Sequence, residues 1–311
     1  MYILQNELRK IVDKIIYMWY NCSVFEKKEC NMSSIIIISY LIFAVIYDQF
    51  FKKLTKTMKN DGGMIVILNI ISGITCLFLI PLFDIKLPEN ILVYLFLGLA
   101  CIFYALNDRF DATARRGIEA STHSMIKQLS TVFMTFIGLF ILKEKLVINK
   151  IIGALLILLS NILIFYNKKS IKENKYITFG ILASIFTTIA LFIDVNYSEQ
   201  FNLPLYVAIT LIVPSILIIL FEKIKIKTIK NELNNSNKIL ILITGISSSF
   251  MLMLKLLAFR QGEISLIAPL CSLTIILNVI VGYLFQKERK NLIKKLSAAV
   301  LIIIGIVLIK I

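Results

Sequence analysis

Long apolar runs separated by short polar stretches dominate the pattern of this sequence. A helix needs about 20 apolar residues to cross the hydrocarbon layer of a bilayer. The predicted spans are 33–51, 63–83, 91–114, 118–142, 149–166, 176–197, 203–221, 238–262, 264–286 and 294–311. The connections are too short for an extramembrane domain, and the longest, 222–237, alternates Lys with Ile and is predicted to lie at the interface. The pattern therefore predicts an all-α integral membrane protein with ten transmembrane helices.

Composition and charge support this class. The chain is 58% hydrophobic and 17% charged, whereas a soluble domain has about 45–50% apolar and 25% charged residues. Lipid must therefore solvate the apolar excess. The net charge of +15 would elsewhere suggest nucleic acid. Here nearly all cations lie between apolar runs, where they meet lipid headgroups. We expect membrane lipid as a partner, no nucleic acid, and a multi-pass protein of the cell membrane, which is the cytoplasmic membrane in a bacterium.

Residues 1–31 differ from the rest of the chain. Ile11, Ile15 and Met18 share a helical face, which is typical of an interfacial helix. The alternative we favour is a mis-annotated leader with translation starting at Met32, because the Lys28-Glu29 pair can be encoded as a ribosome-binding sequence just upstream. No cleaved signal peptide is predicted, because no apolar core precedes a small-residue cleavage site.

The sequence contains an internal repeat. A shift of 144 positions aligns, without a gap, GIEASTHSMIKQLSTVFMTFIGLFILKEK from Gly117 with QGEISLIAPLCSLTIILNVIVGYLFQKER from Gln261. A shift of 146 places Asp48 on Asp194. We therefore expect two five-helix repeats, 32–167 and 168–311. Because five is odd, the second copy must enter the membrane from the opposite side, and inverted repeats of this kind are typical of transporters.

Both repeated stretches run from Ser through Leu-Ser/Thr and Gly to Glu, and on this basis the chain resembles EamA-type members of the drug/metabolite transporter superfamily. The resemblance implies small-molecule transport by ten helices in two EamA repeats. The chain departs from the family in having Lys143 and Lys287 before the terminal Glu residues and Thr131 and Ile275 where Pro is frequent. Because the family moves amino acids, metabolites, drugs and sugars, the resemblance does not identify the cargo.

Two arguments about orientation disagree. The resemblance implies that both termini are cytoplasmic. The positive-inside rule favours both termini outside, because most loop cations, such as Lys52, Lys168, Lys223 and Arg289, would otherwise lie on the external side.

One polar stripe follows the fourth predicted helix. Its members recur every four residues, the spacing that stacks side chains on one helix face: Glu119, His123, Lys127, Thr131 and Thr135. Its counterparts in the ninth helix are almost wholly apolar: Glu263, Ile267, Cys271, Ile275 and Val279. A stripe that the fold required would occur in both copies, so we expect this one to line a cavity, with helix packing as the alternative.

The short turn before this helix sets the depth of its polar residues. Helices three and four are expected to run antiparallel side by side, so that residues equally far from Gly117 lie at equal depth. Asp111 then faces His123, and Asn107 faces Lys127. A buried ammonium needs a carboxylate, so we predict that Lys127 pairs with Asp108 or Asp111, with His123 alongside. The predicted cargo-binding or proton-coupling residues are Asn107, Asp108, Asp111, His123, Lys127 and Thr131.

Other polar groups are candidates for smaller roles. Asp48 and Asp194, near helix ends, are candidate gating residues or structural caps. Glu144 and Glu288, each flanked by cations, are expected to be structural. A lone His cannot build a metal site without companions, and no metal or cofactor is predicted.

The favoured function is a secondary transporter that moves a small metabolite, amino-acid-like, zwitterionic or anionic, by alternating access, either facilitative or proton-coupled. A membrane scaffold or receptor, an ion channel and an intramembrane enzyme remain alternatives. The enzyme is disfavoured because HExxH and Gly-x-Ser-x-Gly motifs are absent from the sequence. The sequence also lacks a Walker motif, and it does not indicate an oligomeric state.

Overall fold

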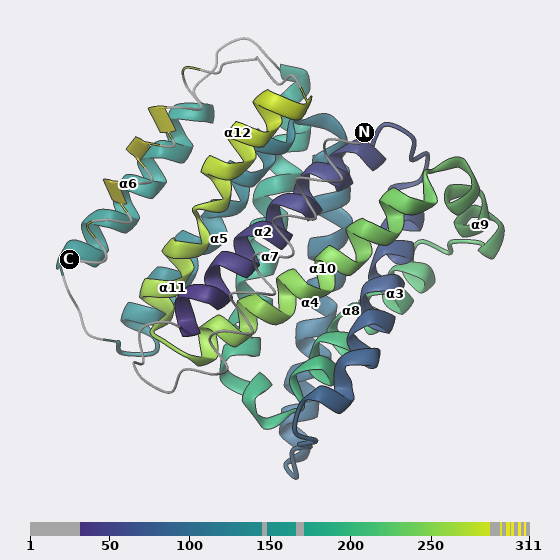
Figure 1. Cartoon of the computed structure of the whole chain (residues 1–311), viewed down its shortest axis with the longest axis horizontal. Coiled ribbons are helices and arrows are strands. Elements are labelled where there is room, and N and C mark those ends of the chain that lie inside the picture. The colour runs from purple at the N-terminus through teal and green to yellow at the C-terminus, as the bar shows by residue number, and fades with distance from the viewer. Residues whose placement is uncertain are drawn as a thin grey trace.

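The computed structural model describes residues 32–144, 148–165 and 171–286, with isolated positions between 293 and 308. Every regular element in these ranges is a helix (Figure 1). The longer helices are α2 (Met32–Leu54), α3 (Asp61–Leu79), α4 (Ile91–Gly117), α5 (Ala120–Phe140), α6 (Ile148–Phe165), α7 (Ile171–Tyr197), α8 (Leu203–Phe221), α10 (Lys238–Arg260) and α12 (Thr274–Gln286). The shorter ones are η1 (Ile80–Leu82), η2 (Ser198–Gln200), α9 (Ile226–Asn235) and α11 (Ile264–Cys271).

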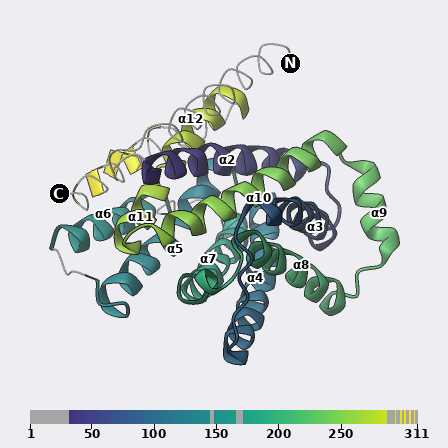
Figure 2. The same ribbon diagram turned by 60° about the horizontal axis from the view of Figure 1, so that its bottom comes forward.

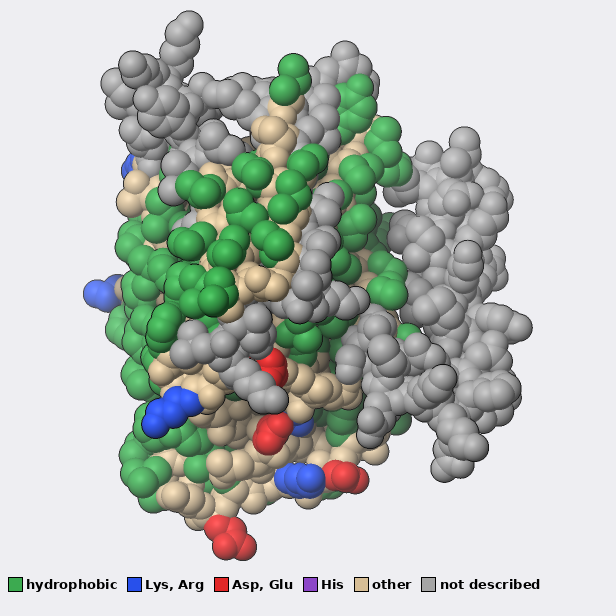
Figure 3. Space-filling model, turned by 90° about the vertical axis from the view of Figure 1, so that its left-hand side faces the viewer, with side chains coloured by type: hydrophobic (Ala, Val, Ile, Leu, Met, Phe, Trp, Pro, Cys, Tyr) green, Lys and Arg blue, Asp and Glu red, His purple; other side chains and the backbone are tan. Residues whose placement is uncertain are grey.

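Seven helical segments in the described residues are long and apolar enough to cross a membrane. Hydrophobic side chains form a broad area on the face shown in Figure 3, and most of the visible charged side chains lie toward its lower end. The chain is therefore an all-helical, multi-pass membrane protein, as predicted. The count of ten spans stays a prediction, because three of the predicted spans, 118–142, 149–166 and 294–311, are not among these seven. The last of the three is described only at isolated positions. Residues 1–31 lie outside the described residues.

Asparagine side chains cap the N-termini of four of the helices. Asn60 accepts a hydrogen bond from Gly63 N at 2.6 Å at the start of α3, and Asn90 accepts one from Leu92 N at 2.9 Å at the start of α4. Asn202 and Asn237 do the same for α8 and α10. Each cap satisfies backbone N–H groups that have no partner within the helix.

The predicted span 264–286 is found as one candidate membrane span, Ile264–Phe285, but it is not one continuous helix, because a turn divides it into α11 and α12. Pro269 lies inside α11 and has no N–H to donate. The following N–H groups bond three residues back, Ser272 N to Pro269 O at 2.9 Å and Leu273 N to Leu270 O at 3.2 Å. These tighter bonds form a turn that interrupts the α-helical ladder.

The prediction that the third and fourth helices lie side by side is also wrong. The fourth predicted helix is α5, and α4 packs chiefly against α7 rather than against it. Ile118 and Glu119, between the two helices, both have extended backbone conformations. The chain therefore leaves α4 at an angle instead of folding straight back. A Cβ on Gly117 would overlap the Tyr176 ring of α7, so only glycine fits at this corner.

The two halves of the chain pack closely. α2 packs against α10 and α3 against α8. Gly245 of α10 allows α3 to approach, because a Cβ there would lie 2.6 Å from the Ile71 side chain, and Ser72 donates a hydrogen bond to Gly245 O at 2.7 Å. Small residues of this kind are typical of contacts between membrane helices.

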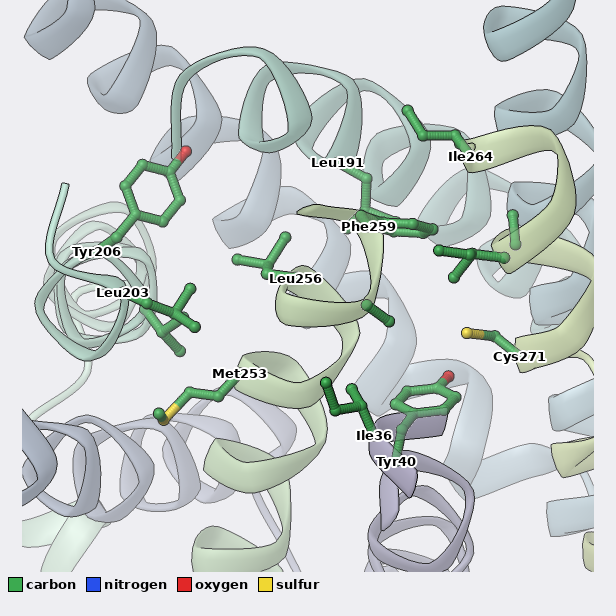
Figure 4. Packing of buried hydrophobic residues seen from close by; sticks show 14 of the residues in the cluster. Ile36, Tyr40, Leu191, Leu203, Tyr206, Met253, Leu256, Phe259, Ile264 and Cys271 are labelled. Atoms are coloured by element: carbon green, nitrogen blue, oxygen red, sulfur yellow. The ribbon is translucent and has the colours of Figure 1, made fainter. Parts of the chain in front are cut away.

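The largest cluster of buried apolar residues surrounds α10. Figure 4 shows Leu256 and Phe259 near its middle, with Tyr206 on one side and Tyr40 and Cys271 on the other. These side chains come from both halves of the chain, and the same region contains the cavity described next.

Candidate functional site

A cavity of about 150 Å³ lies between the two halves of the protein. Helices of the first half (α2, α3, α4 and α5) and of the second half (α7, α8, α10, α11 and α12) contribute to its wall. Its lining combines apolar groups with an unusual number of charged ones. The charged lining residues are Asp48, Asp108, Asp111, Arg115, Lys127, Asp194 and Lys255.

Most of the predicted site residues line this cavity. These are Asn107, Asp108, Asp111, Lys127 and Thr131, together with the candidate gating residues Asp48 and Asp194. Three members of the α5 stripe do not line it: Glu119, His123 and Thr135. His123 is 0% exposed and reaches the site only through Asp111. The stripe is therefore part cavity wall and part helix packing.

Asp111 is the centre of an ionic cluster. It accepts a hydrogen bond from Arg115 Nε at 2.6 Å, forms an ion pair with Lys127 Nζ at 3.0 Å and lies 2.9 Å from His123 Nε2. The predicted pairing of Lys127 with an aspartate is confirmed, with His123 alongside. Arg115 was not predicted, although its position four residues after Asp111 on one helix is the spacing of an ion pair.

Arg115 connects this cluster to α2. It donates to Asp48 at 2.7 Å, and its guanidinium lies over the rings of Tyr47 and Phe51, about 5 Å from each centroid. Asp48 also accepts a hydrogen bond from Asn278 Nδ2 at 2.7 Å. Because Asn278 belongs to α12, the polar network ties the first half of the chain to the second.

The next level of the cavity contains Asn107 and Asp108. Lys127 donates a hydrogen bond to Asn107 Oδ1 at 2.9 Å. This contact was predicted, because the two residues are equally far from Gly117 in the sequence. Asp108 accepts hydrogen bonds from Asn69 at 2.6 Å and from Asn107 at 2.9 Å. Among the described residues no cation lies within ion-pair distance of Asp108, so this carboxylate is hydrogen-bonded without being neutralised.

A second and sparser polar group, contributed mainly by the second half of the chain, also lines the cavity. Asp194 accepts hydrogen bonds from the hydroxyls of Tyr104 and Tyr206. Lys255 lines the same cavity, and its Nζ lies 5.9 Å from the centre of the Phe259 ring. Within the described part of the chain, Lys255 has neither a hydrogen bond nor an ion pair.

Lys255 is the main residue that the sequence analysis missed. It lies within the predicted span 238–262, where a single lysine in an otherwise apolar run was a signal in itself, because ionisable residues inside a span are costly. The repeat offered a second signal, since the 144-residue shift places Lys255 on Asp111. For metals, no group of three or more His, Cys, Asp or Glu side chains suited to an ion occurs in the residues that the structure covers.

Comparisons with known proteins define the family. No curated protein gives a significant match. A solved structure titled only "Crystal structure of protein" aligns with a TM-score of 0.66 and 11% identity, over 89% of this chain and 96% of that one, which shows the fold alone. The EamA-like transporter family matches twice, over residues 31–166 and 174–311. Since the two matches cover nearly the whole chain, this protein belongs to the EamA-like transporter family.

Proposed function

We propose that this protein is a secondary carrier that moves a small zwitterionic or anionic metabolite across the cytoplasmic membrane by alternating access. Its family consists of transporters rather than enzymes, and both halves of the chain contribute to one internal cavity. In this proposal ten helices form two inverted five-helix repeats, and the repeats rock around the cavity so that it opens to each side in turn.

The presence of charges without counter-ions in the cavity wall is the observation that carries the proposal. Asp108 and Lys255 both line the cavity, and neither has an ion-pair partner among the described residues. Unpaired charges are costly in a membrane interior, so they are retained where they serve a ligand. A zwitterion supplies both missing partners, because its ammonium group suits Asp108 and its carboxylate suits Lys255.

Lys127 provides the link between binding and movement. Its ammonium already has three oxygen partners, on Asp111, Asn107 and Thr187. A cargo carboxylate near Lys127 competes with Asp111 for it, and weakening that pair loosens a contact between α4 and α5. Protonation of an aspartate in the cavity would weaken the same contact, which gives a route to proton coupling.

Transport by purified protein in liposomes tests this function. Metabolite profiles of cells with and without the gene first identify compounds whose distribution depends on the protein. Vesicles preloaded with the unlabelled compound are then expected to accumulate the radiolabelled compound by counterflow. Binding without flux would indicate a receptor or scaffold, and chemical conversion of the compound would indicate an enzyme.

A further inference from the structure

The connection between α8 and α10 forms a short helix outside the bundle. Figures 1 and 2 show α9 to one side of the other helices. It is joined to the end of α8 and the beginning of α10, and both of these are candidate membrane spans. α9 therefore lies at the level where two spans leave the membrane, the region of the lipid headgroups.

One buried carboxylate holds α9 in a single orientation. Glu232 is only 2% exposed, and its side chain accepts hydrogen bonds from the backbone N–H groups of Lys59 at 3.1 Å and Asn60 at 2.9 Å. A contact of 3.1 Å between the Thr57 and Ser236 hydroxyls adds to this attachment. The helix thus presents the same face outward instead of moving as a free loop.

An apolar stripe runs along one edge of α9, beside exposed lysines. Ile226 and Leu233, seven residues apart and so on one helical face, are 79% and 36% exposed. Lys230 lies between them and is exposed. Ile229, three residues after Ile226 and four before Leu233, continues the same apolar stripe and packs against the protein core. The stripe therefore begins at the protein core with Ile229 and includes two large apolar side chains, Ile226 and Leu233, that the protein leaves exposed.

The unpaired charges of residues 222–238 are all positive, because both carboxylates of this segment are occupied within the protein. Its exposed cations are Lys223, Lys225, Lys227, Lys230 and Lys238. Its acids are Glu222, which forms an ion pair with Arg109, and Glu232, which is occupied by the backbone N–H groups. No carboxylate of this segment remains to neutralise the lysines.

We propose that this surface, formed by α9 and the lysines on either side of it, is a docking site for anionic phospholipid headgroups. Ile226 and Leu233 enter the boundary between headgroups and acyl chains, as the apolar face of an interfacial helix does. Long lysine side chains extend from that depth to the phosphate groups, and the attraction between them is electrostatic. The ligand is the lipid of the surrounding leaflet rather than the transported cargo.

Native mass spectrometry of the full-length protein tests the proposal. The protein is titrated with dioleoylphosphatidylglycerol, which is anionic, and with dioleoylphosphatidylcholine, which has no net charge. The test variant is Lys227→Gln/Lys230→Gln. The matched control is Lys86→Gln/Lys143→Gln, which removes two lysines at the opposite end of the bundle. Size-exclusion chromatography shows whether each protein is folded and monodisperse.

We expect the wild type and the control to bind phosphatidylglycerol equally and in preference to phosphatidylcholine. The test variant is expected to bind phosphatidylglycerol on the order of tenfold more weakly, because each surface lysine contributes to the attraction. Its binding of phosphatidylcholine should be unchanged. Salt at about 0.5 M should abolish the difference, because exposed charges are screened. Equal binding of phosphatidylglycerol by all three proteins, or no preference over phosphatidylcholine in the wild type, would overturn the proposal and leave a merely solvated charged face.

Discussion

The two sides of the cavity occupy matching positions in the repeats but differ in their charges. In the first repeat, Asp111 and Lys127 form an ion pair. The 144-residue shift places Lys255 on Asp111 and Cys271 on Lys127. An acid is thus replaced by a base, and the base that would neutralise the acid is replaced by a thiol. One repeat carries a paired ion cluster, and the other carries an ammonium that has no ion pair within the described residues.

This difference shows that the residues that determine the fold are not the residues that determine the polarity of the cavity. The packing of the helices recurs in both halves, since α4 packs against α7 as α10 packs against α2. The charges do not recur, so the polarity of the cavity comes from substitutions within a symmetric frame. Asp48 and Asp194 show the same contrast, because Asp48 forms an ion pair with Arg115 while the hydrogen-bond partners of Asp194 are the neutral hydroxyls of Tyr104 and Tyr206.

Loss of the charge at position 127 should have the largest effect. Lys127→Met is expected to abolish transport, because Met fills a similar volume but cannot bind Asp111 or a cargo carboxylate. The protein should still fold, since the Lys127 side chain is 23% exposed to the cavity and Asp111 keeps Arg115 as a partner. Counterflow in liposomes measures the effect. Lys175→Met, which changes an exposed lysine at the start of α7, is the control and should transport normally. Normal counterflow by Lys127→Met would mean that the cluster is only structural.

The two aspartates of α4 should differ in what they contribute. Asp111→Asn leaves Arg115 and Lys127 short of a counter-charge, and loss of one partner of a buried pair costs about 3–5 kcal/mol. Asp108→Asn removes no ion pair, so its cost in stability should be within about 1 kcal/mol while transport is lost. Thermal unfolding in detergent, with counterflow on the folded fraction, separates the two effects. Equal destabilisation by both variants would contradict the distinction between a paired and an unpaired carboxylate.

Much of this fold could be predicted from the sequence, because apolar length alone identifies membrane helices. The span 203–221 was predicted at its observed boundaries. The break between α11 and α12 was missed, since it depends on how the backbone beyond Pro269 finds hydrogen-bond partners. The packing of α4 against α7 was also missed, because the extended residues after Gly117 turn the chain in a way that hydropathy does not encode.

The site was partly predictable for a different reason. Counting from Gly117 gave the correct partners for Lys127, since depth in a membrane follows from position along a helix. The opposite wall could not be found in this way. Lys255 faces the cavity because of how α10 packs against α2, which no local pattern determines. Attention to every ionisable residue within a span would have identified it.

Removal of the ammonium in the second repeat should weaken binding without harming the fold. Lys255 has no ion pair among the described residues, so Lys255→Met leaves no partner unsatisfied and should unfold at the same temperature as the wild type or higher. Its affinity for a carboxylate cargo should fall about tenfold, the equivalent of 1.4 kcal/mol. An amide analogue of the cargo should bind the wild type and the variant equally. Loss of affinity for both compounds would mean that Lys255 supports the shape of the cavity rather than the carboxylate.

The smallest effect is expected at Glu144, outside the cavity. Its carboxylate accepts hydrogen bonds from Ile264 N at 2.8 Å and Ser265 N at 3.0 Å, so it caps the first turn of α11 from the end of α5. The hydrogen-bond partners of Glu144 thus lie in the other repeat, and we expect its role to be structural. Glu144→Gln keeps one acceptor oxygen but loses the charge, which should cost about 1 kcal/mol at a helix N-terminus. The folded yield should fall, and the affinity of the folded protein for cargo should not change. Lys143→Gln, which alters the neighbouring exposed side chain, should affect neither quantity. Normal yield with weakened cargo binding would instead mean that Glu144 takes part in transport and that the functional site extends beyond the cavity.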